Sequence, residues 1–305
     1  MKKYRTFLSI FVFYVIINMI LFPALYIKQA FNGISAWAFN VLPSVLPFMF
    51  FTKVLTSLGS LNGISRIFKR PCQTLYKTHQ VSSLVFLTSV ISGYPVGAKM
   101  TADLYNQEII TRSDAFKMSS FCSTSGPMFI IGAVGIGMFG NATYGYIIFI
   151  CHALGALLNG LLYRNLKVEE FEHKTSTTQS KNNDISSMVL DSALSIISVG
   201  TIIAIFFVII TSLSPLFNLF PPQIASVLEG MVEITKGCID IATCFGNKWS
   251  ILASTFVISF GGISTMMQSM SMLSSIKIPF YIIFIQKLTH ALISSALALI
   301  FVLLI

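Results

Sequence analysis

The chain has 305 residues, of which 54% are hydrophobic and only 10% are charged, with a formal net charge of +9. This composition excludes an ordinary soluble globular domain. The basic residues are scattered through short loops and form no basic helix face, which argues against nucleic acid as a partner. We therefore expect an all-α integral membrane protein, with the lipid bilayer as its surroundings and any functional site built from its membrane helices.

Eight apolar segments have about the 20 residues that a helix needs to cross a bilayer. In chain order they are 7–27, 34–58, 81–105, 119–140, 144–163, 188–213, 249–273 and 279–305. The first segment follows Lys2, Lys3 and Arg5, as a secretory signal would, but no Ala-x-Ala-like cleavage site closes it. We predict that residues 1–33 form a retained N-terminal membrane helix.

A hydrophilic linker, residues 164–187, separates a first half, 34–163, from a second half, 188–305. Two stretches of the first half have similar counterparts in the second. TKVLTSLGSLNGI begins at Thr52 and is similar to FVIITSLSPLFNL from Phe207, and TSVISGYPVGAKM from Thr88 is similar to TFVISFGGISTMMQ from Thr255. Because the two matches occur in the same order, they predict an internal repeat.

Basic residues in the N-terminus, in the 61–77 loop and in the linker predict that all three are cytoplasmic. Five full spans before the linker would place it on the other side, so one of the five segments is expected to be re-entrant. Segment 119–140 is our candidate, because it has a Gly-Pro stop in its first half and four glycines in its second. A re-entrant segment there also inverts the second half relative to the first.

Four stretches interrupt their own helices, and unpaired backbone groups in hydrocarbon are tolerated only where they face protein or water. The first contains Pro95, which cannot donate a helical hydrogen bond and disfavours a helical Tyr94. Gly93 and Gly97 allow the backbone to bend or to approach a partner closely. One helix is expected to end near Ser92 and another to begin just after the proline, with an N-terminus that favours an anion.

Lys99 lies one turn into the restarted helix. A lysine inside an apolar segment is costly, which favours a functional role as counter-charge for an anionic substrate. Two alternatives stay open: the side chain reaches an interface, or it pairs with Asp103 four residues later.

The second interruption places Ser123, Thr124 and Ser125 before Gly126 and Pro127. The three hydroxyl groups supply both donors and acceptors to a ligand. An ordinary helix cap or turn at the membrane edge accounts for the same residues equally well.

The third interruption contains Glu229, Glu233, Lys236 and Asp240 at spacings of four, three and four, on one face of a short helix. The preceding Pro-Pro pair favours a re-entrant hairpin, with a solvated interfacial helix as the alternative. If the charges face inward, Glu229 and Glu233 are candidates for binding a coupling cation or proton.

The fourth interruption offers Gly261, Gly262, Ser264 and Gln268 at membrane depth. Gln268 is the most informative of these, because a long amide in an apolar run usually reaches a polar partner.

Several catalytic classes lack their motifs in this sequence. It has no GxxxxGK[ST] or HExxH, and its histidines lack metal-ligand spacing, so we expect no enzyme, no metal and no cofactor. Ser125 with His152 or His290 is an alternative, as the dyad of an intramembrane hydrolase, but nothing supplies an oxyanion hole.

SGYPVGAKM at 92–100 and SSFCSTSGPMFIIGAVGIGMFG at 119–140 resemble the YlbJ or SpoVV family of sporulation integral membrane proteins. FGGISTMMQ at 260–268 resembles that family's second-half motif, but it carries Ser-Thr-Met-Met-Gln in place of Ser-Val-His-Leu-Gln. The likeness extends from about residue 34 to the end of the chain. It implies a nucleoside-recognition or Gate domain, similar to concentrative nucleoside transporters, with inverted repeats, re-entrant hairpins and broken helices around a midplane site.

The resemblance also implies secondary transport of a small organic anion, dipicolinic acid, across the outer forespore membrane during sporulation. The substrate-binding residues that it implies are Ser92, Gly93, Tyr94, Pro95, Gly97, Lys99, Ser123, Thr124, Ser125, Gly126, Pro127, Gly261, Gly262, Ser264 and Gln268. The missing histidine keeps a nucleoside or nucleobase substrate open. A further alternative is a non-transporting scaffold that forms homo-oligomers or recruits other sporulation membrane proteins.

Overall fold

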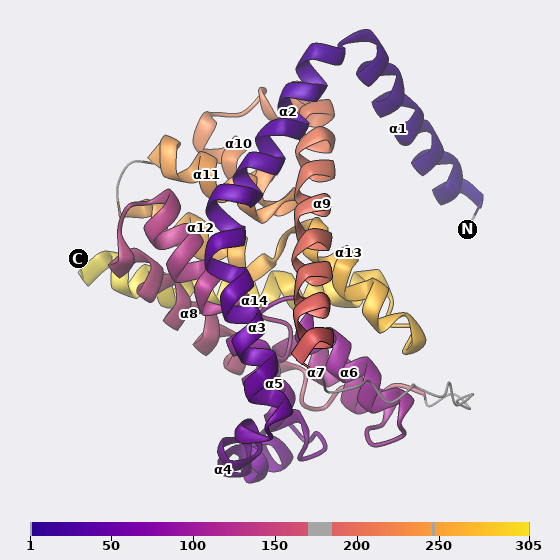
Figure 1. Ribbon diagram of the computed structural model, residues 1–305, viewed down its shortest axis with the longest axis vertical. Coiled ribbons are helices and arrows are strands. Elements are labelled where there is room, and N and C mark those ends of the chain that lie inside the picture. Colours follow the sequence, from indigo (N-terminus) through magenta and orange to yellow (C-terminus); the bar gives the residue numbers. More distant parts are fainter. Residues whose placement is uncertain (1, 170–184, 246–247, 305) are drawn as a thin grey trace.

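A computed structural model describes residues 2–169, 185–245 and 248–304. These residues form helices and no strand (Figure 1). Most of the predicted linker, 164–187, lies outside the described residues.

The helices before the linker belong to the first half, apart from the N-terminal helix α1. Their bounds are α1 Lys2–Leu21, α2 Pro23–Ala36, η1 Trp37–Val41, α3 Leu42–Ser57, α4 Ser60–Leu75, α5 Ser82–Ser92, α6 Val96–Asn106, α7 Arg112–Phe121, η2 Met128–Met138 and α8 Ala142–Leu162. The second half has seven described elements. They are α9 Ile185–Phe217, α10 Pro222–Val232, α11 Ile234–Phe245, α12 Trp249–Phe260, α13 Gly262–Met272, η3 Leu273–Ser275 and α14 Phe280–Leu304.

Five stretches of helix are long and apolar enough to cross a membrane. They are Pro23–Leu55, Ala142–Leu162, Ile185–Phe217, Trp249–Ser275 and Phe280–Leu304. The other three predicted segments retain only shorter apolar helices, Leu8–Leu21, Ser82–Ser92 and Met128–Met138, because helix breaks divide them. Large apolar side chains on α1, α2, α9 and α14 are exposed, as lipid contact requires. The prediction of an all-helical integral membrane protein is confirmed.

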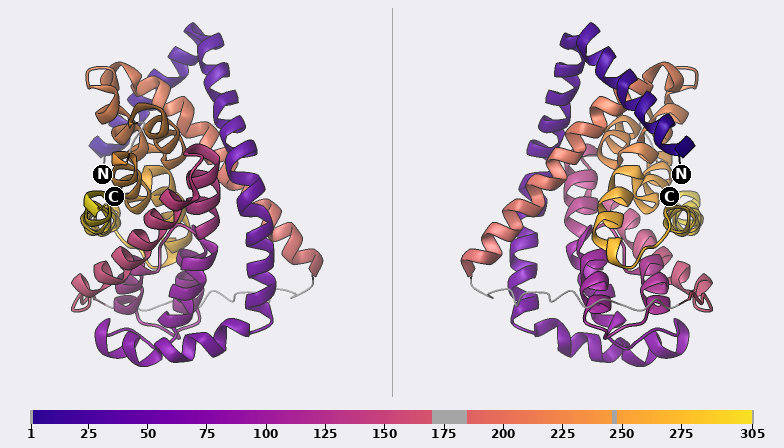
Figure 2. Two further views of the ribbon diagram at one scale, coloured as in Figure 1. Left: turned by 90° about the vertical axis from the view of Figure 1, so that its left-hand side faces the viewer. Right: turned by 90° about the vertical axis from the view of Figure 1, so that its right-hand side faces the viewer.

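Apart from α4, which has no counterpart in the second half, the two halves repeat one succession of elements: a long helix, a helical hairpin, a broken helix and a second long helix. In the first half these are α2 to α3, α5–α6, α7–η2 and α8, and in the second half α9, α10–α11, α12–α13 and α14. Equivalent long helices pack on each other, since α9 packs along α2 and α3 while α14 packs along α8. Figure 2 shows α9 crossing the long helix of the first half. This arrangement supports the predicted internal repeat.

Each hairpin closes where a glycine removes a side chain between its two helices. A Cβ on Gly97 of α6 would lie 2.7 Å from Ser89 Oγ of α5 and would overlap the Cys122 carbonyl oxygen, so only glycine lets α6 pack against both. In the second hairpin a Cβ on Gly237 would lie 2.7 Å from the Gly230 backbone nitrogen and would overlap its Cα. The contacts with Ser89 and with Gly230 join residues only seven or eight positions apart, which a continuous helix would hold far from each other.

The hairpin of the first half is therefore 82–106, and our expectation that 119–140 folds back is wrong. The helices on either side of that second break, α7 and η2, do not pack side by side. The alignment of the two halves therefore differs in part from the predicted one. The match of 52–64 to 207–219 falls at the ends of equivalent long helices, whereas 88–100 belongs to a hairpin and 255–268 to a broken helix.

The first predicted helix is also divided. Pro23 begins α2 with its ring at the first helical position, and α1 turns away from α2 at Phe22 (Figure 1). The helix that starts at Pro23 continues through the predicted boundary at residue 33 into η1 and α3. No helix end separates an N-terminal unit from the first half at that position.

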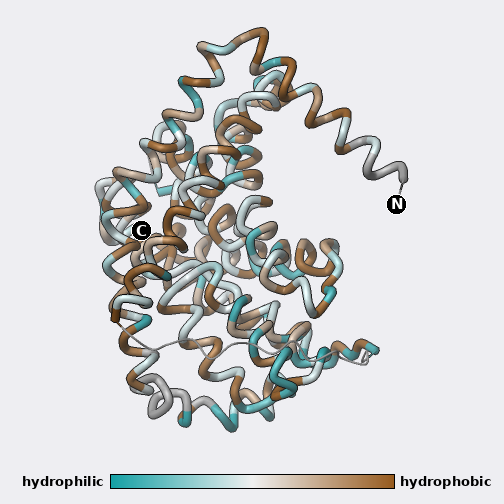
Figure 3. Tube along the Cα trace, turned by 45° about the vertical axis from the view of Figure 1, so that its right-hand side comes forward, coloured by the Kyte–Doolittle hydropathy of each residue, from teal (hydrophilic) through white to brown (hydrophobic). Residues whose placement is uncertain are grey.

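Basic residues lie together at the end of the molecule that carries α4 (Figure 1), where Figure 3 shows hydrophilic positions among hydrophobic ones. Lys77 Nζ donates to Asn165 Oδ1 at 2.7 Å, and Lys117 Nζ donates to the Lys77 carbonyl at 2.7 Å. Arg164 donates to the Thr74 carbonyl at 3.3 Å. The 61–77 loop and the start of the linker thus lie together, as their shared cytoplasmic assignment requires.

Candidate functional site

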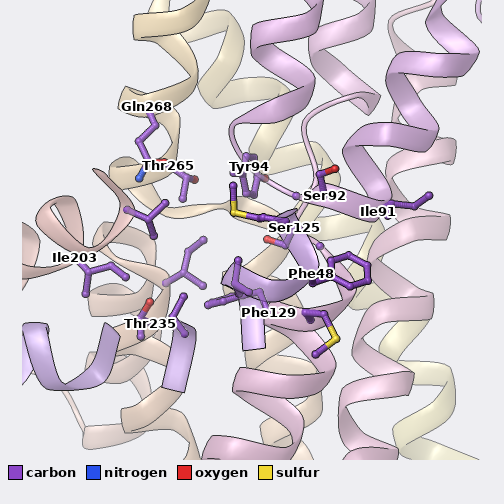
Figure 4. A pocket seen from close by; sticks show the side chains of 18 of the residues that line it. Phe48, Ile91, Ser92, Tyr94, Ser125, Phe129, Ile203, Thr235, Thr265 and Gln268 are labelled. Carbon is purple, nitrogen blue, oxygen red and sulfur yellow. The ribbon is translucent and has the colours of Figure 1, made fainter. Parts of the chain in front are cut away.

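The four interruptions meet around one cavity between the two halves (Figure 4). The cavity has a volume of about 80 Å³, which is room for several water molecules. The lining residues are Val41, Val45, Phe48, Met49, Ile91, Ser92, Gly93, Tyr94, Ser125, Gly126, Met128, Phe129, Val199, Ile203, Glu233, Ile234, Thr235, Thr265 and Gln268.

The tip of the first hairpin contributes Ser92, Gly93 and Tyr94. Helix α5 ends at Ser92 and α6 begins at Val96, which confirms the predicted break. Gly93 has φ +77°, and a Cβ there would lie 2.6 Å from the Gly126 backbone nitrogen. The hairpin tip therefore rests directly on the second interruption, and only glycine fits between them.

The second interruption is an extended segment that lacks helical hydrogen bonds and is held by side chains. Ser89 Oγ lies 3.0 Å from Thr124 Oγ1, and the Ser125 backbone N–H donates to His152 Nε2 at 2.9 Å. The other ring nitrogen, His152 Nδ1, lies 2.9 Å from Ser259 Oγ. The imidazole thus holds the backbone of the break and not the Ser125 hydroxyl, an arrangement that does not form the alternative hydrolase dyad.

The second hairpin turns at Glu233, which is 3% exposed and lines the cavity with Thr235. Glu233 Oε2 accepts the backbone N–H of Lys236 at 2.8 Å and so caps the start of α11. Lys236 Nζ pairs with Glu229 Oε2 at 3.1 Å and also with Asp240. The four charges are therefore divided between two helices, contrary to the single helix we expected, and Glu229 lies outside the cavity.

The fourth interruption is a pair of glycines, Gly261 with φ +85° and Gly262 with φ +64°, between α12 and α13. Neither lines the cavity, but they place Thr265 and Gln268 of α13 in its wall. A Cβ on Gly261 would lie 3.1 Å from the Tyr94 hydroxyl oxygen, so the break also leaves room for the first hairpin tip.

The remaining walls are apolar. They come from η1 and α3, from the start of η2 and from α9, with Phe48, Phe129 and Ile203 in view in Figure 4. These residues were not predicted, because an apolar side chain in a membrane helix has the same sequence signature whether it faces lipid, protein or a cavity.

Lys99 was expected to supply positive charge, but it lies on the exposed face of α6 and does not line the cavity. Among the described residues, Lys99 forms no ion pair with Asp103. A buried cation next to the cavity lining is Lys287 of α14, which is 3% exposed. Its Nζ donates to the Tyr94 hydroxyl at 2.6 Å and to the Ser123 carbonyl. Its signal in the sequence is the same as that of Lys99, a lysine within a long apolar segment.

The predicted site residues thus fall into two groups. Those that line the cavity are Ser92, Gly93, Tyr94, Ser125, Gly126, Gln268 and Glu233. Those outside its lining are Pro95, Gly97, Lys99, Ser123, Thr124, Pro127, Gly261, Gly262, Ser264 and Glu229. Half of the second group are glycines or prolines beside the breaks. We expected Gln268 to reach a polar partner, but it makes no hydrogen bond among the described residues. Within the described residues, no group of three or more His, Cys, Asp or Glu side chains could hold a metal ion.

Comparison with known proteins gives one curated relative with strong similarity. No family model matches the chain. No solved structure matches it either. The sporulation integral membrane protein YlbJ of Bacillus subtilis (strain 168) is 28% identical over 296 residues, covering 84% of this chain and 72% of that protein. Together with its membrane-spanning helices, this similarity identifies the chain as an integral membrane protein homologous to YlbJ.

Proposed function

We propose that the chain is a secondary transporter of a small organic anion, with dipicolinic acid as the first substrate to test. One observation carries the proposal: two interruptions from each half converge on a single cavity between the halves. Interrupted helices from two structural repeats, meeting around a central site, are the arrangement that secondary transporters use for alternating access.

The chemistry of the cavity suits a small aromatic anion. Phe48, Phe129 and Ile203 offer apolar surface to a ring, while the hydroxyl groups of Tyr94 and Ser125 can donate to carboxylate oxygens. Lys287 contacts Tyr94 from behind and brings a positive charge close to the cavity. The homologue's name concerns sporulation, and the family resemblance supports dipicolinate within that setting.

The test is uptake by purified protein reconstituted into liposomes. Liposomes loaded with Tb³⁺ report dipicolinate entry directly, because the dicarboxylate binds the ion and sensitises its luminescence. We expect luminescence to rise with protein and to saturate with external dipicolinate. Protein-free liposomes and liposomes with a Lys287→Met variant are the controls. A rate equal to that of protein-free liposomes would overturn the proposal.

A nucleoside or nucleobase is a second candidate substrate, favoured by Glu233 and Gln268. Glu233 places a carboxylate in the cavity wall and Gln268 an amide, and neither Lys287 nor another described cation is part of that wall. A carboxylate and an amide recognise a neutral base more readily than an anion. Uptake of labelled uridine or uracil into the same liposomes, without dipicolinate uptake, would favour this candidate.

A further inference from the structure

We propose that Lys287 is a coupling site that takes up a proton when the anion binds and releases it when the anion leaves. The inference rests on the proposed anion transport and adds its driving force: a proton gradient would move the substrate. Lys287 belongs to the second half, whereas both of its hydrogen-bond partners belong to the first.

Among the described residues, Lys287 has no fixed counter-charge. The ion pairs found there join Lys236 to Glu229 and Asp240, away from this position. Its own partners, the Tyr94 hydroxyl and the Ser123 carbonyl, are neutral. A buried ammonium group without an anion is strongly unfavourable, and the chain can relieve this either by losing the proton or by gaining an anion. Proton binding and anion binding at this place therefore favour each other.

The titratable groups around Lys287 do not share this role. His152 accepts the Ser125 N–H at Nε2, so its hydrogen lies on Nδ1 and points to Ser259 Oγ. His290 Nε2 lies 3.0 Å from the His152 carbonyl and donates to it, while its Nδ1 is buried without a partner among the described residues. Both imidazoles are thus neutral in this arrangement.

The other elements packed near Lys287 contribute no further charge to it. Helix α12 has no titratable side chain. The charged groups of α7 are engaged elsewhere, because Lys117 donates to the Lys77 carbonyl, Arg112 Nε donates to the Ile276 carbonyl, and Asp114 Oδ2 accepts the Thr111 backbone N–H at the start of the helix. Tyr94, a further titratable neighbour, accepts a hydrogen from Lys287 Nζ through its hydroxyl oxygen. Lys287 is the group of this cluster that an arriving anion would charge.

The contacts of Lys287 also link its charge to the cavity. Tyr94 lies at the first hairpin tip and lines the cavity, and Ser123 begins the second interruption. An ammonium group holds both of these oxygens with charge-assisted hydrogen bonds, and a neutral amine holds them more weakly.

The proton balance is simple. A neutral Lys287 amine gains one proton as one anion enters from one side of the membrane, and it gives that proton up as the anion leaves on the other.

Calorimetric titration of the detergent-solubilised full-length chain with dipicolinate measures this proton directly. Titrations at neutral pH in buffers of different ionisation enthalpy give the number of protons taken up per anion bound. We expect about one proton for the wild type, and for Lys167→Met, which changes an exposed lysine after α8. Lys287→Arg keeps a permanent charge and should bind dipicolinate with no proton uptake. Lys287→Met should bind at least tenfold more weakly.

Lys287→Met should remain folded, because it exchanges a buried amine that has no counter-charge for an apolar side chain of similar length; thermal unfolding checks this. Wild-type proton uptake in Lys287→Arg would overturn the inference, as would no dipicolinate binding by the wild type. Liposomes separate the two proposals. Dipicolinate uptake that is indifferent to a pH gradient overturns the coupling alone. Lys287-dependent proton uptake on binding, with no transport, overturns the transport function and leaves the linked binding site standing.

Discussion

Burial assigns different roles to Lys99 and Lys287, which both lie inside predicted membrane segments. Lys287 is 3% exposed and contacts a cavity residue, whereas Lys99 is exposed on α6. Lys99→Ala should therefore leave dipicolinate uptake within about twofold of the wild-type rate, because the side chain touches nothing in the site. Uptake per inserted protein in Tb³⁺-loaded liposomes measures this. Loss of uptake in Lys99→Ala, with normal membrane insertion, would show that Lys99 contributes to the substrate site.

Glu233 combines two roles, since it caps α11 and faces the cavity. Glu233→Gln keeps an oxygen that can accept the Lys236 N–H but removes the negative charge. We expect it to unfold at nearly the wild-type temperature and to bind dipicolinate more tightly, by about threefold to tenfold, because a like charge is gone. Calorimetric titration gives the affinity.

Two matched variants make this prediction specific. Glu229→Gln removes a carboxylate outside the cavity and should not change the affinity for dipicolinate. Glu233→Ala removes the cap as well as the charge and should cost about 1 kcal/mol of stability. Weaker dipicolinate binding by Glu233→Gln would instead assign Glu233 to the coupling cation or proton considered from the sequence.

The second hairpin is an element whose closure depends on backbone contact between two glycines. Gly237→Ala would place a methyl group on Gly230 of the facing helix, so α10 and α11 would have to separate. Overpacking of this kind typically costs about 1–3 kcal/mol. We expect a lower unfolding temperature and weaker dipicolinate binding, because the hairpin tip carries Glu233 and Thr235.

The matched control for this element is Gly137→Ala in η2. A Cβ there lies 3.5 Å from its nearest neighbour, an ordinary contact, and its backbone is not left-handed. Its unfolding temperature should stay near that of the wild type. Equal destabilisation by the two substitutions would mean that the glycine contact does not hold the second hairpin closed.

The sequence predicts where helices break, but it does not predict the direction that the chain takes after each break. Glycine and proline chemistry predicted the end at Ser92 and the restart after Pro95, and both are found. The same chemistry is compatible with a straight continuation or a reversal. The difference comes from tertiary contacts of Gly97, with Ser89 and with the Cys122 carbonyl, which helix-breaker patterns do not encode. Helix-breaker patterns therefore do not distinguish a hairpin at 82–106, which the structure shows, from one at 119–140, which we expected.

For the whole molecule, the cavity exists only where the two halves meet. The first half supplies apolar lining residues and the hairpin tip that carries Tyr94. The second half supplies Glu233, Gln268 and the apolar lining residues of α9. Single-residue patterns gave the polar lining, because polar residues are conspicuous in apolar segments. They did not give the apolar lining or single out Lys287, since those assignments depend on how α9 and α14 pack against the first half.

This division predicts that the halves associate as separate chains. Residues 1–169 and 185–305, expressed together, should copurify and transport dipicolinate, because α9 packs along α2 and α3, and α14 along α8. Extensive apolar packing and close small-residue contacts drive such association in a bilayer. Copurification through a tag on one chain, followed by the liposome assay, measures both properties. The omitted stretch includes most of the hydrophilic linker, so retained uptake would also argue against a docking scaffold that requires it.

Packing between the long helices provides the control for this experiment. A Cβ on Gly200 of α9 would lie 2.5 Å from the Trp37 ring, whose Nε1 donates to the Ile196 carbonyl at 3.1 Å. Gly200→Leu in the second chain should therefore reduce copurification severalfold, because the indole cannot stay in place. Ile197→Leu changes an exposed residue of the same helix and should have no effect. Equal recovery of both variants would show that the halves associate through another surface.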